Sequence, residues 1–263
     1  MLLLDRHESR SRVGGLLRQA AQSAAIQRLR SMRQFAEEEV VIADGGRRGL
    51  FSCETQPWTG VWLDEVDSRS WREHWLLAPP QVGKTVLLLI AIQYHLFELG
   101  EPVLFGLPQM EMASEKWQVD IRPAIEASRY ADLLPTSGPG SGGGSKLEMV
   151  RFRNGAYLKF VSAHGGAEKR SGSTARVLIL DEVDKYDQVK DERESDPIQQ
   201  MRGRVMSFGD TWVLYGACTV TLPTGRIWRE HERGSGGAIV MPCRHCGGFV
   251  VPDEGDFRGY REA

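Results

Sequence analysis

The sequence predicts an α/β fold with a mostly parallel central sheet that is flanked by helices. Short continuous apolar runs at residues 103–107 and 177–180 are typical of buried strands. Helix-like segments at residues 86–99 and 110–130 alternate with these strands along the chain. Such alternation is typical of parallel strands joined by crossover helices that cover both faces of the sheet.

A β-hairpin insertion is predicted within this sheet. Residues 149–153 and 156–162 are separated by Asn154-Gly155, a strong signal for a two-residue hairpin turn. Further strands are expected at residues 75–78, 211–220 and 239–241, and further helices at residues 11–40, 59–68 and 197–206.

Length and charge limit the organisation of the chain. With 263 residues, it has room for one large domain and a small appendage. We expect an Arg-rich helical arm at 1–50, the main domain at 51–240, and a loose tail with a CxxC motif at 241–263. A net charge of −2 excludes a polycation that coats DNA, so any DNA contact must be local. The arm is either a solvated, partly disordered segment or a DNA- or partner-binding segment.

The sequence predicts no membrane segment. No apolar run reaches the roughly 18–20 residues that span a bilayer. The first residues are charged too early for a secretory signal. We therefore expect a cytoplasmic protein.

The strongest local motif is the loop at residues 78–85, Ala-Pro-Pro-Gln-Val-Gly-Lys-Thr, between a predicted strand and a predicted helix. It fits the phosphate-binding P-loop except that Ala78 replaces the first glycine. Backbone N–H groups at a helix N-terminus bind phosphate, Lys84 would neutralise β/γ oxygens, and the Thr85 hydroxyl would hold Mg²⁺. The expected ATP-binding residues of this loop are Pro80, Gln81, Val82, Gly83, Lys84 and Thr85.

The buried strand at 177–180 ends in two carboxylates, Asp181 and Glu182. Ligands bind beyond the carboxyl ends of parallel strands, which would place Asp181 near Mg²⁺ and Glu182 near a water that attacks the γ-phosphate. Without the P-loop, the same pair would indicate only a charged helix start after a core strand.

The Asp-Glu pair favours the additional-strand (RecA-like) branch of P-loop ATPases, in which a strand lies between the P-loop strand and the acidic strand. Residues 211–220 are the candidate for that strand. Thr219 and Thr221, at its polar end, are candidates for sensing the γ-phosphate and coupling its loss to movement. The alternative is an ordinary polar strand end.

Several segments together resemble the ATPase domain of the phage terminase large subunit of the lambda-type GpA family. The matching segments, in order, are residues 35–37, 51–52, 57–58, 81–85, 180–186, 221–224 and 242–247. The resemblance implies an ATPase that uses ATP and Mg²⁺ to move double-stranded DNA into a procapsid. It also implies a small terminase subunit and a portal protein as partners, a ring of identical subunits, and work inside the bacterial host cell.

The resemblance also implies roles for two further residues, each of which has an alternative interpretation. Gln56 is expected to contact adenine, with Trp58 stacking on it; the alternative is a buried tryptophan beside a loop. Arg170 is a candidate for contact with DNA or phosphate; the alternative is a solvated surface arginine.

The CxxC motif is formed by Cys243 and Cys246, and the resemblance implies a second pair that is not visible. Because a structural zinc site needs four ligands, we expect these two thiols not to hold Zn²⁺ alone. Only 17 residues follow Cys246, so we expect no nuclease domain and no nuclease activity in this chain.

Two rival functions remain. A helicase or translocase unrelated to packaging would need a second RecA-like domain, which is not visible. A truncated prophage remnant would bind nucleotide or DNA without packaging, but the intact Lys84, Asp181 and Glu182 argue against decay of the site.

Overall fold

The computed structural model describes residues 29–43, 48–141, 147–163, 174–188, 196–220, 224–243 and 245–251. The chain divides into two compact units, Met1–Arg30 and Ser31–Ala263. The elements below belong to the second unit. The helix predicted at 11–40 lies mostly outside the described residues, and its described part is α2 (Met32–Glu39). Ser31 begins this helix, because its side chain accepts a hydrogen bond from the Gln34 N–H.

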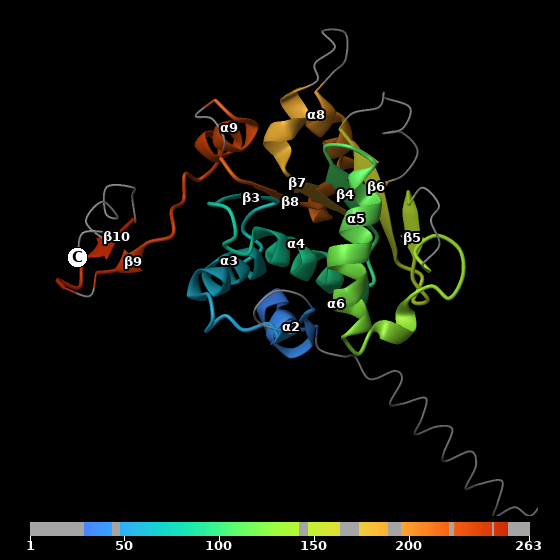
Figure 1. Ribbon diagram of the computed structural model, residues 1–263. Helices are drawn as coiled ribbons and strands as arrows, with labels where there is room; N and C mark the ends of the chain where they lie inside the picture. The colour runs from blue at the N-terminus through green and yellow to red at the C-terminus, as the bar shows by residue number, and fades with distance from the viewer. Residues whose placement is uncertain are drawn as a thin grey trace, which may run out of the picture. The chain divides into compact units, whose positions relative to one another are not determined.

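The core of the fold is a six-stranded sheet in the order β3-β8-β7-β4-β6-β5 (Figure 1). All neighbouring pairs are parallel except β5 and β6, which form the antiparallel hairpin predicted around Asn154-Gly155. The mostly parallel α/β fold is therefore confirmed. The strands are β3 (Glu73–Leu77), β4 (Val103–Leu107), β5 (Met149–Arg151), β6 (Tyr157–Ser162), β7 (Val177–Asp181) and β8 (Val213–Cys218).

The strand predicted at 211–220 lies where the additional-strand arrangement requires it. As β8, it separates the P-loop strand β3 from the acidic strand β7. Leu77 pairs with Cys218, and Asp181 pairs with Ala217. The carboxyl ends of these three strands therefore meet at one edge of the sheet.

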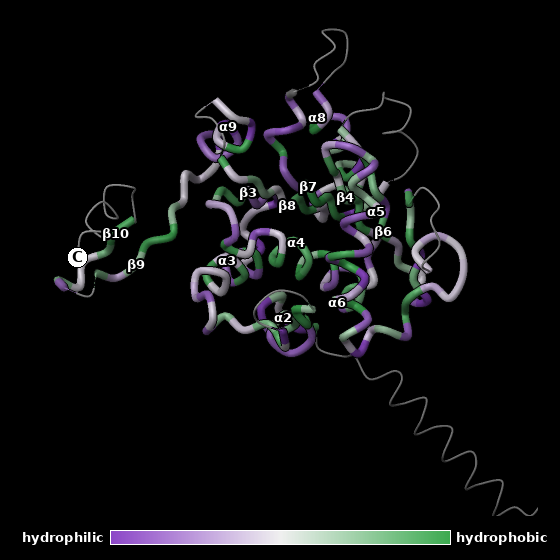
Figure 2. Tube along the Cα trace, viewed as in Figure 1, coloured by the Kyte–Doolittle hydropathy of each residue, from purple (hydrophilic) through white to green (hydrophobic). Residues whose placement is uncertain are grey.

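Helices cover both faces of the sheet. Successive residues of a strand point to opposite faces, so each face has its own set of buried side chains for helices to pack against. Phe105 and Ile179 belong to the core cluster that includes residues of α2, α3 (Pro57–Asp67), α4 (Lys84–Gln93) and α6 (Arg122–Glu126). Leu104 and Leu178 belong to the second cluster, with residues of α8 (Pro197–Arg202) and α9 (Arg226–Arg233). Figure 2 shows hydrophobic residues along the strands and α4, and hydrophilic residues on the outer helices.

One glycine of the sheet is required by close packing. Gly216 in β8 pairs with Trp75 in β3, and a Cβ on Gly216 would lie 2.2 Å from the Trp75 ring. Any larger residue would push the indole away.

Several helices differ from their predicted bounds. The helix predicted at 86–99 begins at Lys84 and changes after Gln93 into a π-helical segment, η1 (Tyr94–Glu98). The segment predicted at 110–130 divides into α5 (Met112–Glu115), a π-helical segment η2 (Lys116–Ile121) and α6. Pro123 in the first turn of α6 has no N–H to donate, which explains why a regular α-helix does not continue through this region.

Other elements are short and have weak sequence signals. They include the hairpins β1 (Val41–Ile42) with β2 (Gly49–Leu50), and β9 (Met241–Pro242) with β10 (Phe249–Val250). The strand predicted at 239–241 is found instead as β9, at residues 241–242. The 3₁₀ segments are η3 (Ala131–Leu133), η4 (Val183–Gln188) and η5 (Met206–Thr211). In the described part of the chain, no helix has the length and apolar character needed to span a bilayer.

Candidate functional site

The P-loop joins β3 to α4 through two residues in the left-handed region of backbone conformation. Gln81 has φ 61° and Gly83 has φ 95°. A Cβ on Gly83 would also lie only 2.7 Å from Oε1 of Gln56. Gly83 is therefore required both by its backbone angle and by the amide packed against it.

The N-terminus of α4 fits an anion. Its N-cap residue is Gly83, which has no side chain to accept hydrogen bonds from the first turn. The N–H groups of that turn and the positive end of the helix dipole then face the loop, an arrangement suited to phosphate.

Lys84 lies folded over the loop. Its Nζ donates to the carbonyl oxygens of Ala78 at 3.0 Å and Pro79 at 2.5 Å. Partial burial lowers the pKa of Lys84, while the nearby carboxylates of Asp181 and Glu182 act in the opposite direction. Asp181 and Glu182 therefore lie near enough to Lys84 for their charges to act on its ammonium.

The two acidic residues differ in their surroundings. Asp181 is the last residue of β7 and is 5% exposed. Glu182 donates its N–H to the Ala217 carbonyl at 2.9 Å, while its φ of 54° is unusual for a residue with a side chain. Such backbone strain is often found at functional sites.

A lysine is paired with each of these carboxylates. Nζ of Lys116 lies 2.9 Å from Oδ2 of Asp181, and Lys185 forms an ion pair with Glu182. Lys116 also lies 3.5 Å from Oδ2 of Asp120. Burial lowers the pKa of Lys116, but Asp181 and Asp120 outweigh burial, so the net shift of that pKa is upward.

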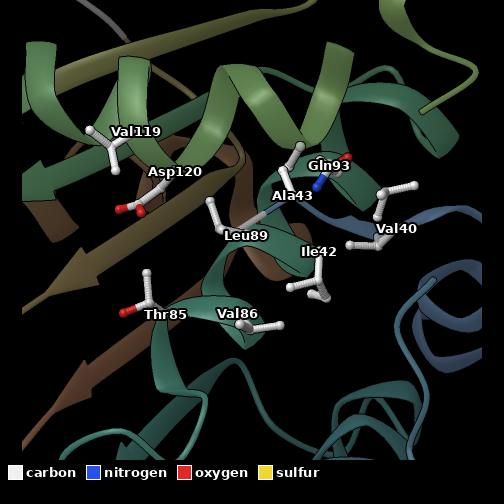
Figure 3. A pocket seen from close by; sticks show the side chains of 11 residues that line it. Val40, Ile42, Ala43, Thr85, Val86, Leu89, Gln93, Val119 and Asp120 are labelled. Atoms are coloured by element: carbon white, nitrogen blue, oxygen red, sulfur yellow. The ribbon is translucent and has the colours of Figure 1, made fainter. Parts of the chain in front are cut away.

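A small, mainly apolar pocket of about 150 Å³ lies between β1, α4 and η2 (Figure 3). Thr85, from the first turn of α4, and Asp120, from η2, line its polar part. The pocket therefore lies between Thr85, the predicted Mg²⁺ ligand, and Asp120, the second carboxylate near Lys116.

The remaining predicted site residues have different positions. Gln56 precedes α3 and lies against Gly83, whereas Trp58 is partly buried and packs against the main core. Thr219 follows β8 directly. The Sγ of Cys218, the last residue of β8, donates a hydrogen bond to the Thr219 carbonyl at 3.2 Å. Thr221 and Arg170 lie outside the described residues.

Cys243 and Cys246 lie at the turn of the β9–β10 hairpin. The Cys243 N–H donates to the Gly248 carbonyl at 2.7 Å, and the Gly247 N–H donates to the Cys243 carbonyl at 2.9 Å. Backbone N–H groups of Cys246 and His245 lower the pKa of the Cys243 thiol. Within the described ranges, no cluster of three or more His, Cys, Asp or Glu residues has a geometry for holding a metal ion.

Two site residues were not predicted from the sequence. Lys116 has no motif around it, and only the packing of η2 brings it to Asp181. Asp184 accepts a hydrogen bond from the Ile227 N–H at 2.8 Å, which links the segment after β7 to α9. In the sequence, Asp184 is marked only as the second Asp after the Asp-Glu pair. Its partner, helix α9, was not predicted from the sequence.

A P-loop before α4, an acidic end on β7 and the added strand β8 between them define the additional-strand class of P-loop ATPase folds. Residues 45–258 match the family model described as phage terminase large subunit gpA, ATPase domain. The chain belongs to this family.

Two solved structures are similar to the chain. The large terminase ATPase domain of Thermus phage P74-26 has 16% identity and a TM-score of 0.43, with 69% of this chain and 72% of that chain covered. An arginine-to-alanine mutant of the same domain has 15% identity and a TM-score of 0.43, with 76% of this chain and 82% of that chain covered. No curated protein matches the chain.

Proposed function

We propose that the chain is a Mg²⁺-dependent ATPase motor that moves double-stranded phage DNA into a procapsid. The observation that carries the proposal is that Lys84, at the start of α4, lies near Asp181 and Glu182, at the end of β7, with β8 between the P-loop strand and β7. Membership of the terminase ATPase family supports the same reading.

The residues of the site fit a magnesium–nucleotide complex. Uncapped N–H groups at the start of α4 and the Lys84 ammonium suit the β- and γ-phosphates. Thr85 and Asp181 would hold Mg²⁺, because hydroxyl and carboxylate oxygens are the ligands that this ion prefers. Bound Mg²⁺ supplies charge neutralisation for phosphoryl transfer.

Glu182 is proposed to orient the attacking water and accept its proton. A carboxylate directly after the metal-binding aspartate would be placed to orient a water beside the γ-phosphate. Its ion pair with Lys185 is half-exposed and must open for this role. Thr219 and Thr221 are proposed to couple loss of the γ-phosphate to movement.

Contacts to the rest of the substrate and to partners are further parts of the proposal. Gln56 is proposed to contact adenine, because its amide lies against the P-loop at Gly83. Arg170 is proposed to contact DNA or phosphate. We propose a division into an arm at 1–50, the motor at 51–240 and a tail at 241–263 that needs other ligands to bind Zn²⁺, with α2 of the arm packed into the main core through Phe35.

The proposed assembly is a ring of identical subunits in the bacterial cytoplasm, with a small terminase subunit and a portal protein. An arginine from a neighbouring subunit is proposed to complete charge stabilisation, since such a residue in trans has a large effect on phosphoryl transfer.

A packaging assay tests this function. The chain, the small subunit, portal-bearing procapsids, Mg²⁺ and ATP are mixed with linear duplex DNA, and DNA protected from nuclease is measured. Protection that needs ATP and is lost in Lys84→Ala supports the motor. Nucleotide binding without hydrolysis or protection would instead favour a remnant.

A further inference from the structure

The ammonium of Lys116 lies where a metal ion is expected. Its Nζ is 2.9 Å from Oδ2 of Asp181, and the two side chains are 17% and 8% exposed. A poorly hydrated carboxylate is stabilised by a positive partner close to it. Among the described residues, Lys116 supplies that partner to Asp181 through this ion pair.

This arrangement cannot persist when a divalent cation binds the same carboxylate oxygen. Mg²⁺ binds oxygen ligands at about 2.0–2.1 Å in nearly ideal octahedral geometry. An ammonium about 3 Å from that oxygen would then face a dication at close range in a poorly hydrated site, where charge repulsion is strong. Lys116 therefore has to leave Oδ2 of Asp181.

A second acceptor is already within reach of Lys116. Oδ2 of Asp120 is 3.5 Å from Nζ, and Asp120 is four residues further along the same helical segment. Asp120 is 31% exposed and lines the pocket that also contains Thr85 (Figure 3).

The backbone at Lys116 is well anchored, so a rotation of the side chain suffices. Trp117 and Ile121 are buried in the main core, and the Trp117 indole donates to the Gly140 carbonyl at 3.2 Å. The lysine stem is flexible, with four rotatable carbons between backbone and charge.

We propose that Lys116 is a placeholder cation that neutralises Asp181 in the nucleotide-free chain and transfers to Asp120 when Mg²⁺ arrives with nucleotide. This inference rests on the proposed nucleotide site. Lys116 is thus a positioning residue: it holds the Asp181 carboxylate in place, and it competes with the metal for one of its oxygens.

The first test is the Mg²⁺ dependence of nucleotide binding, measured with a fluorescent ATP analogue on the full chain. Lys116→Met keeps the length of the side chain and removes the competing charge. We expect its half-saturating Mg²⁺ concentration to fall by about fivefold, in line with removal of one partly buried ion pair. Arg122→Met is the control, because it removes a similar i,i+4 ion pair, Arg122–Glu126, from the next helix; it should leave the value unchanged.

A second variant should give the opposite result, which distinguishes the proposed competition from a general folding defect. Asp120→Asn removes the negative charge that attracts Lys116 away from Asp181, so Lys116 stays on Asp181 and the half-saturating Mg²⁺ concentration should rise. Thermal unfolding without nucleotide gives an independent measurement. Lys116→Met should unfold at a lower temperature than wild type in EDTA and gain more stability from Mg²⁺ alone.

Other outcomes overturn the inference. An unchanged Mg²⁺ dependence in both variants would show that the ion pair has no effect on metal binding. Weaker nucleotide binding by Lys116→Met in EDTA would make Lys116 a phosphate contact instead. Failure of the wild-type chain to bind nucleotide at any Mg²⁺ concentration would overturn the proposed function itself, a result distinct from the other two.

Discussion

The carboxylate of Asp184 caps helix α9: its Oδ1 accepts a hydrogen bond from the Ile227 N–H at 2.8 Å. Asp184 is three residues after Asp181, whereas α9 follows β8 and residues 219–225 along the chain. A Cβ on Gly225 would lie 2.5 Å from Oδ2 of Asp184, so the backbone before α9 packs directly against this carboxylate. The segment after the acidic end of β7 and the start of α9 are therefore joined by one side chain.

Replacing Asp184 tests this cap. Asp184→Ala should destabilise the chain by about 1 kcal/mol, the usual cost of losing a capping side chain. Asp184→Asn keeps an oxygen acceptor and should remain within a few tenths of a kcal/mol of wild type. Urea unfolding measures both, and equal destabilisation by the two variants would contradict a capping role.

Gly83→Ala should abolish or strongly weaken nucleotide binding, because φ 95° and the Gln56 amide at 2.7 Å both exclude a Cβ. Gly155 is the matched control, since its φ is 90° but no atom lies within 4 Å of the position that a Cβ would take. Gly155→Ala should cost about 1 kcal/mol of stability from backbone strain and leave nucleotide binding intact. Equal nucleotide affinity in wild type and Gly83→Ala would refute this account of the P-loop.

The stability of the chain should fall on acidification because of His74. Burial lowers the pKa of His74 to about 4, from an ordinary value near 6.5. The unfolded chain then binds a proton more readily than the folded chain, so stability is lost as pH falls from about 6.5 to about 4. His95 is buried too, and burial also lowers its pKa.

The measurement is urea unfolding of wild type and His74→Phe at pH 7 and pH 4.5. Phe keeps the ring packing against Tyr215, whose centroid lies 5.4 Å from that of His74. We expect wild type to lose more stability than the variant, by at most about 3 kcal/mol. Parallel losses would mean that His74 does not contribute to the acid sensitivity.

Gln93→Leu should stabilise the chain. Gln93 is 1% exposed, and neither Nε2 nor Oε1 has a hydrogen-bond partner among the described residues. Replacing unpaired buried polar atoms with an apolar side chain of similar size should gain about 1–2 kcal/mol. Thermal unfolding measures the gain, and Gln118→Leu on the exposed side of η2 serves as the control. A loss of stability in Gln93→Leu would indicate that the amide has a partner such as a buried water.

The sheet was largely predictable because its signals are local. The apolar runs at 103–107 and 177–180, and Asn154-Gly155 between alternating segments, became β4, β7 and the β5–β6 hairpin. The place of β8 between β3 and β7 followed from the acidic pair, since Asp-Glu after a buried strand favours the additional-strand arrangement. Helix ends were less predictable, because π-helical segments such as η1 and η2 depend on packing and on Pro123 rather than on periodicity.

The site was predictable only where it is built from motifs. Lys84 and Thr85 belong to the P-loop motif at the start of α4, and Asp181 and Glu182 stand at the end of β7. Their assigned roles stay predictions until nucleotide is bound. Lys116 is distant from Asp181 along the chain, and only tertiary packing joins them. Helix α9 was missed because most of its residues are charged; Ile227 is its one fully buried apolar side chain.

Glu182→Gln tests the proposed role of Glu182 as the base for ATP hydrolysis at this site. ATP hydrolysis and binding of a fluorescent ATP analogue are measured for wild type, Glu182→Gln and the exposed control Glu232→Gln, each with Mg²⁺ and linear duplex DNA. Glu182→Gln should bind nucleotide as wild type does but hydrolyse it at least about 100-fold more slowly, as expected for loss of a general base. Hydrolysis by Glu182→Gln at the wild-type rate would contradict that role.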